Sequence, residues 1–238
     1  MTDDPIVAEV HRVRAETARR FGNDLRAYGR FLQEWERRHP GGTVVLSGTN
    51  TYTGTTDVSA FLPVNPATLL VNGDNSGATG IVQVSGSGSV LGGTGTIGGN
   101  VYTFSSTITG GTTTGVGTLT LQQNLNLRTG EGDGTYLANL SGSLSDLLAI
   151  TGNLNLGGQT TLNIVGSADG ITTYTLATFG TRTDMFQTVT GIPTGYALVY
   201  NTGDIELVPI PEPATWLGAG FAVAALLWTQ RRRFAKRA

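Results

Sequence analysis

The stretch from Gly41 to Pro209 contains no pattern of a long helix, and this feature restricts the fold more than any other. Short runs of β-branched and leucine residues recur there between turns rich in Gly, Asn, Thr and Ser, for example over residues 43–46, 68–71, 80–84, 118–121, 124–127, 149–151, 153–156 and 160–165. Many runs alternate an apolar residue with Thr or Asn, which is typical of a strand with one buried face. Their starts lie roughly 7 to 20 residues apart, which predicts either a β-sandwich or a β-solenoid.

Two features of this stretch favour the solenoid. The turns use Gly and Asn, which tolerate the positive φ angles of tight corners. The outward positions carry uncharged Thr, Ser and Asn, which can form polar ladders between stacked rungs. We therefore expect a mainly β chain built as a parallel β-helix of roughly five or six rungs, each burying its apolar residues against the next rung.

The distribution of charge divides the chain into three segments, 1–40, 41–209 and 210–238. The first segment holds 15 of the 32 charged residues, and the middle one holds 31 of the 35 Gly but only two bases, Arg128 and Arg182. A hydrophobic content of 39% excludes a disordered acidic tail, and the absence of Cys excludes a disulfide framework or a Cys-ligated metal. A net charge of −2 is inconsistent with a basic protein that binds nucleic acid.

Residues 1–40 predict an amphipathic helical segment. Asp4 suits the N-cap and Pro5 the first helical position, and Gly22-Asn23 predicts a break between two short helices. Apolar residues follow with helical spacing at positions 6, 10, 13, 21, 25, 28, 32 and 35. The segment lacks the continuous apolar run of a secretory signal. It resembles a family of very small bacterial proteins, some suspected of partnering toxins, and this resemblance implies no chemistry.

Four motifs in the middle segment resemble a known repeat. The runs LSGTNTYTGTTDVSA, TLLVNG, GSVLGGTGTIGGNV and GVGTLTLQQNLNL occur in this order. From about Gly41 to Leu127 the chain resembles the autotransporter-associated β-strand repeat, and residues 136–208 more loosely resemble the segment that follows such repeats. The resemblance implies a right-handed parallel β-helix in a secreted or surface-exposed scaffold, without enzymatic activity. Residues 61–67 depart from the family pattern and predict a loop that bulges from one rung.

The same segment offers little for catalysis or cofactor binding. Gly93 to Gly98 fit the G-x-G-x-x-G pattern, but the strand-like residues 101–104 follow where a dinucleotide site needs a helix, so we expect no cofactor. The resemblance to the repeat implies that these glycines are rung corners. The two histidines, His11 and His39, both lie in the helical segment, and no G-x-S-x-G motif is present. The chain is therefore not expected to be an enzyme.

Nine acidic residues in the middle segment leave other activities open. They are Asp57, Asp74, Glu131, Asp133, Asp146, Asp169, Asp184, Asp204 and Glu206. We single out Glu131 and Asp133, which are close together in a Gly-rich sequence that indicates an exposed turn. Calcium binding there and hydrolysis of a glycan by paired carboxylates remain alternatives. Irregularly spaced Thr-x-Thr motifs leave ice binding as a further alternative, although structural polar ladders explain them better.

The C-terminal segment contains three consecutive elements: Pro211-Glu212-Pro213, an uncharged run from Ala214 to Trp228, and Arg231-Arg232-Arg233. At 1.5 Å per residue, the 15-residue run would be a short membrane helix of about 22 Å, and the arginine cluster would act as a cytoplasmic stop. The three elements resemble the PEP-CTERM sorting signal. This resemblance implies an exosortase-type enzyme that cleaves near the motif, so the chain would be its substrate.

These patterns predict a non-enzymatic protein of the cell surface or extracellular matrix, transiently anchored in the membrane through residues 214–228. Its expected partners are the exosortase and a surface polysaccharide; the alternative is a carbohydrate-binding or carbohydrate-active β-helix. The missing secretory signal conflicts with export. A fused or truncated reading frame explains the conflict best, and a misassigned start or a tail anchor are the alternatives.

Overall fold

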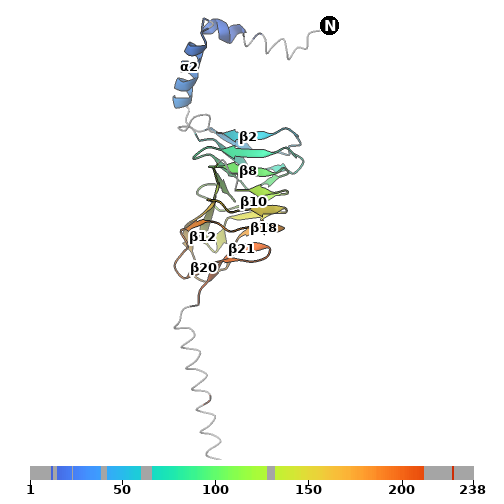
Figure 1. Cartoon of the computed structure of the whole chain (residues 1–238), viewed down its shortest axis with the longest axis vertical. Helices are drawn as coiled ribbons and strands as arrows, with labels where there is room; N and C mark the ends of the chain where they lie inside the picture. The colour runs from blue at the N-terminus through green and yellow to red at the C-terminus, as the bar shows by residue number, and fades with distance from the viewer. Residues whose placement is uncertain are drawn as a thin grey trace, which may run out of the picture.

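The computed structural model describes residues 12, 15–22, 24–38, 42–59, 66–127, 132–211 and 227. Its main body is a β-solenoid of about five turns, in which rungs stack along one axis and each rung contributes a strand to each of three sheets (Figure 1). The mainly β, parallel solenoid predicted from the alternating runs is thus confirmed.

Three sheets make up the walls of the solenoid. The first sheet consists of β1 (Thr43–Leu46), β3 (Thr68–Val71), β6 (Val90–Gly92), β9 (Thr107–Thr109), β12 (Thr135–Gly142), β16 (Thr161–Ala168) and β19 (Thr188–Thr190), with β13 (Leu144–Ser145) beside β12. The second consists of β4 (Asp74–Asn75), β7 (Thr96–Ile97), β10 (Thr118–Leu121), β14 (Leu147–Ile150), β17 (Tyr174–Thr178), β21 (Asp204–Pro209) and β20 (Tyr196–Tyr200). The third consists of β2 (Thr56–Ser59), β5 (Val82–Ser85), β8 (Val101–Phe104), β11 (Leu125–Asn126), β15 (Asn153–Asn155) and β18 (Thr181–Thr183).

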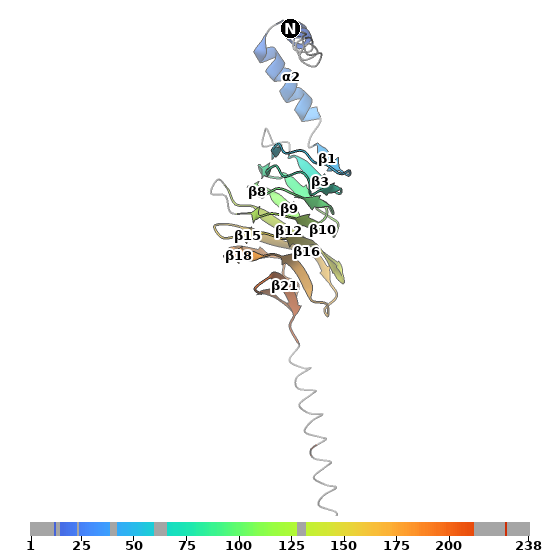
Figure 2. The same cartoon turned by 90° about the vertical axis from the view of Figure 1, so that its right-hand side faces the viewer.

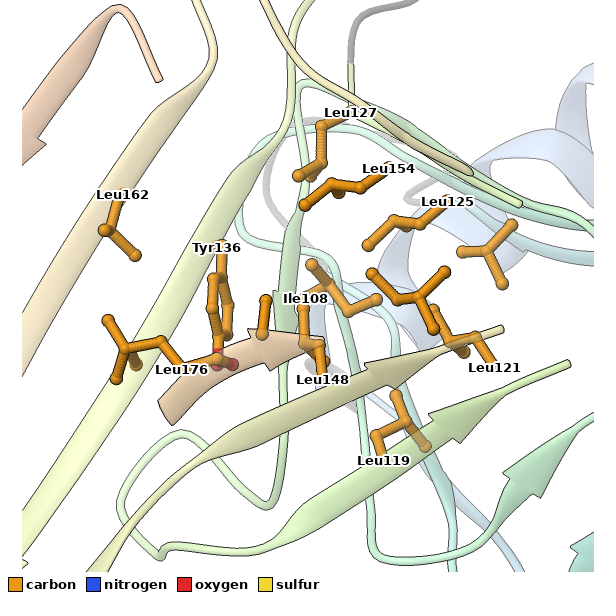
Figure 3. Close-up of a cluster of buried hydrophobic side chains, with 14 of the residues drawn as sticks. Ile108, Leu119, Leu121, Leu125, Leu127, Tyr136, Leu148, Leu154, Leu162 and Leu176 are labelled. Carbon is orange, nitrogen blue, oxygen red and sulfur yellow. The ribbon is translucent and has the colours of Figure 1, made fainter. Parts of the chain in front are cut away.

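The core consists of aliphatic side chains stacked in register from rung to rung. On the first sheet one row of buried residues runs through Leu69, Leu91, Ile108, Tyr136 and Leu162, and it continues to the partly buried Val189. Leu119 and Leu148 pair in the second sheet, and Leu125 and Leu154 pair in the third. Figure 3 shows Ile108, Tyr136 and Leu162 of the first row together with these two leucine pairs. Because every rung covers the rung before it, the alternation of one buried and one exposed residue is enough to form a continuous core.

Glycine allows the corners of adjacent rungs to approach closely. A Cβ atom at Gly99 would overlap the carbonyl of Gly80, and one at Gly80 would overlap the carbonyl of Gly54, so these three positions form a glycine stack along the axis. Gly93 lies against the Val71 carbonyl and also has a φ of 118°, which side chains rarely tolerate. The G-x-G-x-x-G motif therefore forms rung corners between β6 and β8, as its sequence context predicts.

The C-terminal end of the stack changes from parallel to antiparallel pairing. The strands β20 and β21 form an antiparallel hairpin, and β21 pairs antiparallel with β17 at the edge of the second sheet. The rings of Tyr174 and Tyr196 lie 5.7 Å apart, and those of Tyr136 and Phe186 lie 6.5 Å apart, so aromatic side chains fill the last rungs. The sequence did not predict this reversal.

The N-terminal helix α2 (Leu25–Arg38) lies beyond the β1 end of the stack (Figures 1 and 2). Residues 15–20 are also helical, and the chain turns at Phe21 and Gly22, where φ of Gly22 is 58°. The backbone N–H of Arg26 donates to the Asp24 carboxylate at 2.8 Å, which caps α2. The predicted break at Gly22-Asn23 is confirmed at Gly22. The proposed cap at Asp4 lies outside the described residues.

Two other expectations fall largely on residues that the structure does not describe. The loop predicted over residues 61–67 is described only at Pro66 and Ala67. The C-terminal hydrophobic helix predicted over residues 214–228 is described only at Leu227. Within the described part of the chain, no helix combines the length and apolar character that a membrane crossing requires.

Candidate functional site

Amide side chains form rung-to-rung ladders along the third sheet, and one of these ladders follows the corner where the strands begin, with Asn100 and Asn124 just before β8 and β11 and Asn153 at the start of β15. Asn124 donates from Nδ2 to Oδ1 of Asn100 at 2.9 Å, and its own Oδ1 accepts from the backbone N–H of Asn153 at 2.8 Å. The next outward row repeats this pattern, since Nδ2 of Asn155 donates to Oδ1 of Asn126 at 3.3 Å. These hydrogen bonds confirm the polar ladders expected from the uncharged outward residues, and they satisfy polar groups without introducing charge.

Two aromatic side chains interrupt this polar face. Tyr102 and Phe104 occupy alternate positions of β8, so both point outward, whereas Val101 and Thr103 between them are buried. The register places Gln83 beside Tyr102 and Ser85 beside Phe104. Both rings are partly exposed although the same strand places two other residues in the core.

A hollow of about 480 Å³ lies beside Phe104. It is lined by Asp57, Gln83, Ser85, Gly86, Phe104 and Ser105, which come from β2, β5 and β8 and from the corners that follow β5 and β8. Figure 1 labels β2 and β8 near the N-terminal end of the stack, and β5 lies between these two strands in the third sheet. The lining combines one aromatic ring, one amide, two hydroxyls and one carboxylate, and it contains no basic side chain. We call this hollow, together with the adjacent Tyr102, the β8 site.

A second hollow of about 470 Å³ lies near the C-terminal end of the stack. It is lined by Gly157, Gly158, Arg182, Asp184, Met185, Phe186 and Gln187. The guanidinium carbon of Arg182 lies 4.8 Å from the ring centre of Tyr200 and 5.9 Å from that of Phe179. Stacking of this kind stabilises the cation between aromatic faces, which accounts for the position of the only base on the described solenoid strands.

The carboxylates near this second hollow support a turn. Asp133 accepts a hydrogen bond from the backbone N–H of Gln159, and its carboxylate packs against Gly158. A Cβ atom at Gly157 would lie only 2.6 Å from Oδ2 of Asp184, so both acids press on the Gly157-Gly158 corner. These contacts give the two acids a structural role at the Gly157-Gly158 corner.

Each hollow contains a strained corner. Ser105 (φ 52°) and Asp184 (φ 61°) are the two non-glycine residues with positive φ in the described part of the chain. Ser105 directly follows β8 and Asp184 directly follows β18, and the equivalent corner after β5 is Gly86, with φ 90°. The backbone at the corner from the third sheet to the first therefore favours a positive φ. This left-handed conformation costs a residue that has a side chain roughly 1–2 kcal/mol of stability.

Asp146 forms a buried polar cluster that the sequence analysis did not single out. Its side chain is fully buried, and its two oxygens accept hydrogen bonds from Oγ1 of Thr109 at 2.8 Å, from the Gly117 N–H at 2.9 Å and from Nδ2 of Asn139 at 2.7 Å. Burial, followed by the charge of Asp146, raises the pKa of Tyr136 well above its usual value. The cluster lies inside the stack and lines neither hollow. Because Asp146 accepts hydrogen bonds from both Gly117 and Asn139, it fastens the 110–117 connection to β12.

The remaining described acids of the solenoid accept hydrogen bonds in turns and in the β20–β21 hairpin. Asp74 caps a turn at Ser76, Asp169 caps the turn at residues 169–172, and Nδ2 of Asn201 donates to both Asp204 (2.6 Å) and Glu206 (3.1 Å). Asp204 and Glu206 thus lie close together on β21, a pairing that the sequence analysis did not weigh. They bind the same amide in a hairpin turn, and neither lines one of the two hollows. Over the described ranges, no cluster of three or more His, Cys, Asp or Glu residues could hold a metal ion.

The structure places only one of the residues assigned to sorting. Pro211 is exposed two residues after the end of β21, whereas Glu212, Pro213, Arg231, Arg232 and Arg233 lie outside the described residues. Glu131, considered for calcium, also lies outside them. The sequence analysis missed Tyr102, Phe104 and Gln83, because only the strand register shows that Val101 and Thr103 face inward.

Comparison with known proteins adds no further assignment. No protein-family model and no curated protein matched this sequence. The function of the chain is therefore inferred from its residues and their geometry.

Proposed function

We propose that this chain is a non-enzymatic structural or adhesive protein of the bacterial cell surface or extracellular matrix. The observation that supports it best is the outer surface of the solenoid, where ladders such as Asn100, Asn124 and Asn153 replace the charges of an ordinary soluble domain. A stack of hydrogen-bonded rungs with tight corners forms a stiff, weakly charged rod with few flexible sites for proteases.

The C-terminal segment supplies the proposed route to the surface. Pro211-Glu212-Pro213, the apolar residues 214–228 and Arg231 to Arg233 resemble the PEP-CTERM signal, and Pro211 lies two residues after the end of the last strand. We propose that an exosortase-type enzyme cleaves near Pro211 and leaves the solenoid outside the cell. The resemblance of residues 41–127 to the autotransporter-associated repeat supports a right-handed β-helix in this role.

Intact mass measured together with cell fractionation tests this proposal. The chain is expressed in the organism that encodes it, as the original sequence and as Pro211→Ala/Glu212→Ala/Pro213→Ala. The expected result is a shortened species in the surface or medium fraction that ends near Pro211 and disappears in the triple variant. Pro193→Ala, which changes a proline in a loop of the solenoid, serves as the control and leaves processing unchanged.

A chain that keeps its C-terminal residues and stays in the cytoplasm or inner membrane would contradict the proposal. Processing that continues in the triple variant would show that another protease acts, which would also contradict the proposed role of the motif.

A further inference from the structure

We infer that the β8 site, formed by Tyr102 and the hollow beside Phe104, binds a neutral polysaccharide chain. The first reason is the pair of aromatic rings. Alternate residues of one strand lie about 6.6–6.8 Å apart along it, so Tyr102 and Phe104 are two neighbouring, partly exposed aromatic residues on the outward face of β8. A flat apolar ring packs well against the C–H face of a pyranose ring, and its partly exposed surface gains free energy when it is covered.

The second reason is the set of polar groups around these rings. Gln83 lies beside Tyr102 on one flank and Asn126 on the other, because β5 and β11 both pair with β8. Ser85 lies beside Phe104, and Asp57 lies beside Gln83. Amides and hydroxyls can donate and accept at once, as sugar hydroxyls do, whereas a carboxylate such as Asp57 accepts from two adjacent hydroxyls.

The charge of the lining indicates a neutral ligand. The six residues that line the hollow include one carboxylate and no base. A uronic acid or a sulfated sugar would place its negative charge near Asp57, and the described residues that line the hollow offer no compensating cation, which is unfavourable at this polar but partly enclosed surface. A neutral chain meets no such repulsion.

The rigidity of the surface also favours binding. The ladders on the third sheet hold Asn100, Asn124 and Asn153 in fixed positions, and Ser105 is kept at the rim with a φ of 52°. Strained residues are often retained at binding sites, where the surrounding structure holds them in place. A preformed surface loses little conformational entropy when it binds a chain, so weak individual contacts can add up.

Affinity electrophoresis of the purified full-length chain tests this inference. Native gels contain hydroxyethyl cellulose, galactomannan or soluble starch as neutral probes, and alginate or polygalacturonate as anionic probes. The expected result is a slower migration in at least one neutral gel and none in the anionic gels. Tyr102→Ala and Phe104→Ala should each weaken the binding about tenfold, because each variant removes one large apolar side chain that the bound sugar would bury.

Matched variants separate binding from folding. Tyr102→Phe and Phe104→Trp keep a ring at each position and should bind within about threefold of the original chain, because they preserve the stacking surface. Phe31→Ala removes a partly exposed aromatic residue from α2, outside the solenoid, and should change nothing. Equal thermal midpoints of all variants show that the losses are local.

Three results would overturn the inference. They are normal migration of the original chain in every neutral gel, retardation only in anionic gels, and retardation that the double variant Tyr102→Ala/Phe104→Ala leaves unchanged. Because the assay uses purified protein, its outcome is independent of the sorting experiment, and either proposal can fail while the other holds.

Discussion

The side-chain amide of Asn139 donates to the buried carboxylate of Asp146 at 2.7 Å, and the backbone N–H of Asn139 donates to the same oxygen at 3.0 Å. The two residues flank the hairpin in which the end of β12 pairs with β13, so one carboxylate holds the base of this hairpin. A buried carboxylate of this kind stabilises the fold only while all its donors remain in place.

The isosteric variant Asp146→Asn tests this dependence. We expect it to lower the free energy of unfolding by about 2–3 kcal/mol, because the NH2 group of the new amide cannot accept the hydrogen bonds that one carboxylate oxygen accepted. Chemical denaturation monitored by circular dichroism measures the change. Asp57→Asn changes an exposed carboxylate on β2 and should stay within about 0.5 kcal/mol of the original chain. Equal effects of the two variants would contradict the buried-cluster interpretation.

Tyr136 offers a second test of the interior. Its hydroxyl donates to the carbonyl of Leu176 at 2.7 Å, which links β12 to β17 across the core. Tyr136→Phe leaves that buried carbonyl without this donor and should cost about 1–2 kcal/mol in the same measurement. Tyr102→Phe removes an outward hydroxyl and should cost almost nothing. If both variants unfold at the same denaturant concentration, the hydrogen bond does not contribute to stability.

The close approach of the corners predicts a strong dependence on glycine. Gly93→Ala places a methyl group against the Val71 carbonyl in a backbone with a φ of 118°, so we expect a loss of at least about 2 kcal/mol. A methyl group at Gly54 would lie in open space on a backbone of ordinary φ, and Gly54→Ala should therefore be nearly neutral. Thermal unfolding curves of the two variants give the comparison, and a neutral Gly93→Ala would mean that the corner relaxes.

The strained corner at Ser105 predicts a gain in stability. Ser105→Gly relieves the positive φ, and after the greater flexibility of unfolded glycine is subtracted, the expected gain is about 0.5–1 kcal/mol. The neighbouring variant Ser106→Gly should destabilise the protein instead, because the buried hydroxyl of Ser106 donates to the Val84 carbonyl at 2.8 Å. A shift of the thermal midpoint in the same direction for both variants would contradict this assignment.

Asp169 predicts a dependence of stability on acid. Hydrogen bonds from the Thr172 side chain, and from the Ile171 and Thr172 N–H groups, hold the pKa of Asp169 well below its usual value. A lowered pKa stabilises the fold at pH values above the unfolded-state pKa of about 4, and this contribution disappears as the pH falls further. Asp169→Asn should therefore lower the thermal midpoint at pH 7, and its difference from the original chain should shrink between pH 5 and pH 2. A difference that stays constant over this range would refute the linkage.

The strand pattern could be predicted from the sequence because each rung repeats one local rule. The runs at residues 43–46, 68–71 and 118–121 form β1, β3 and β10 with those same bounds. Alternation with Thr or Asn fixes which residues face inward, and glycine marks where the chain turns. Such local signals suffice in a solenoid, because neighbouring rungs are also neighbours in the sequence.

The candidate sites were harder to predict because they depend on contacts between rungs. Asp146 and Thr109 are 37 residues apart, and no spacing rule indicates that their side chains meet. The outward direction of Tyr102 and Phe104 likewise follows from the pairing of β8 with β5 and β11, since Val and Thr in the same run are equally compatible with either face. The hairpin of β20 and β21 involves a change from parallel to antiparallel pairing, which alternation alone cannot encode.

The hairpin at the C-terminal end also bears on how such molecules avoid joining one another. An open stack of parallel strands is a template on which further strands can add, as they do in amyloid. Here the second sheet ends in the antiparallel β20, and the first and third end in β19 and β18, each only three residues long. A strand from another molecule that approaches this end meets no long edge for parallel pairing. Growth into fibres by strand addition is therefore blocked at this end of the solenoid.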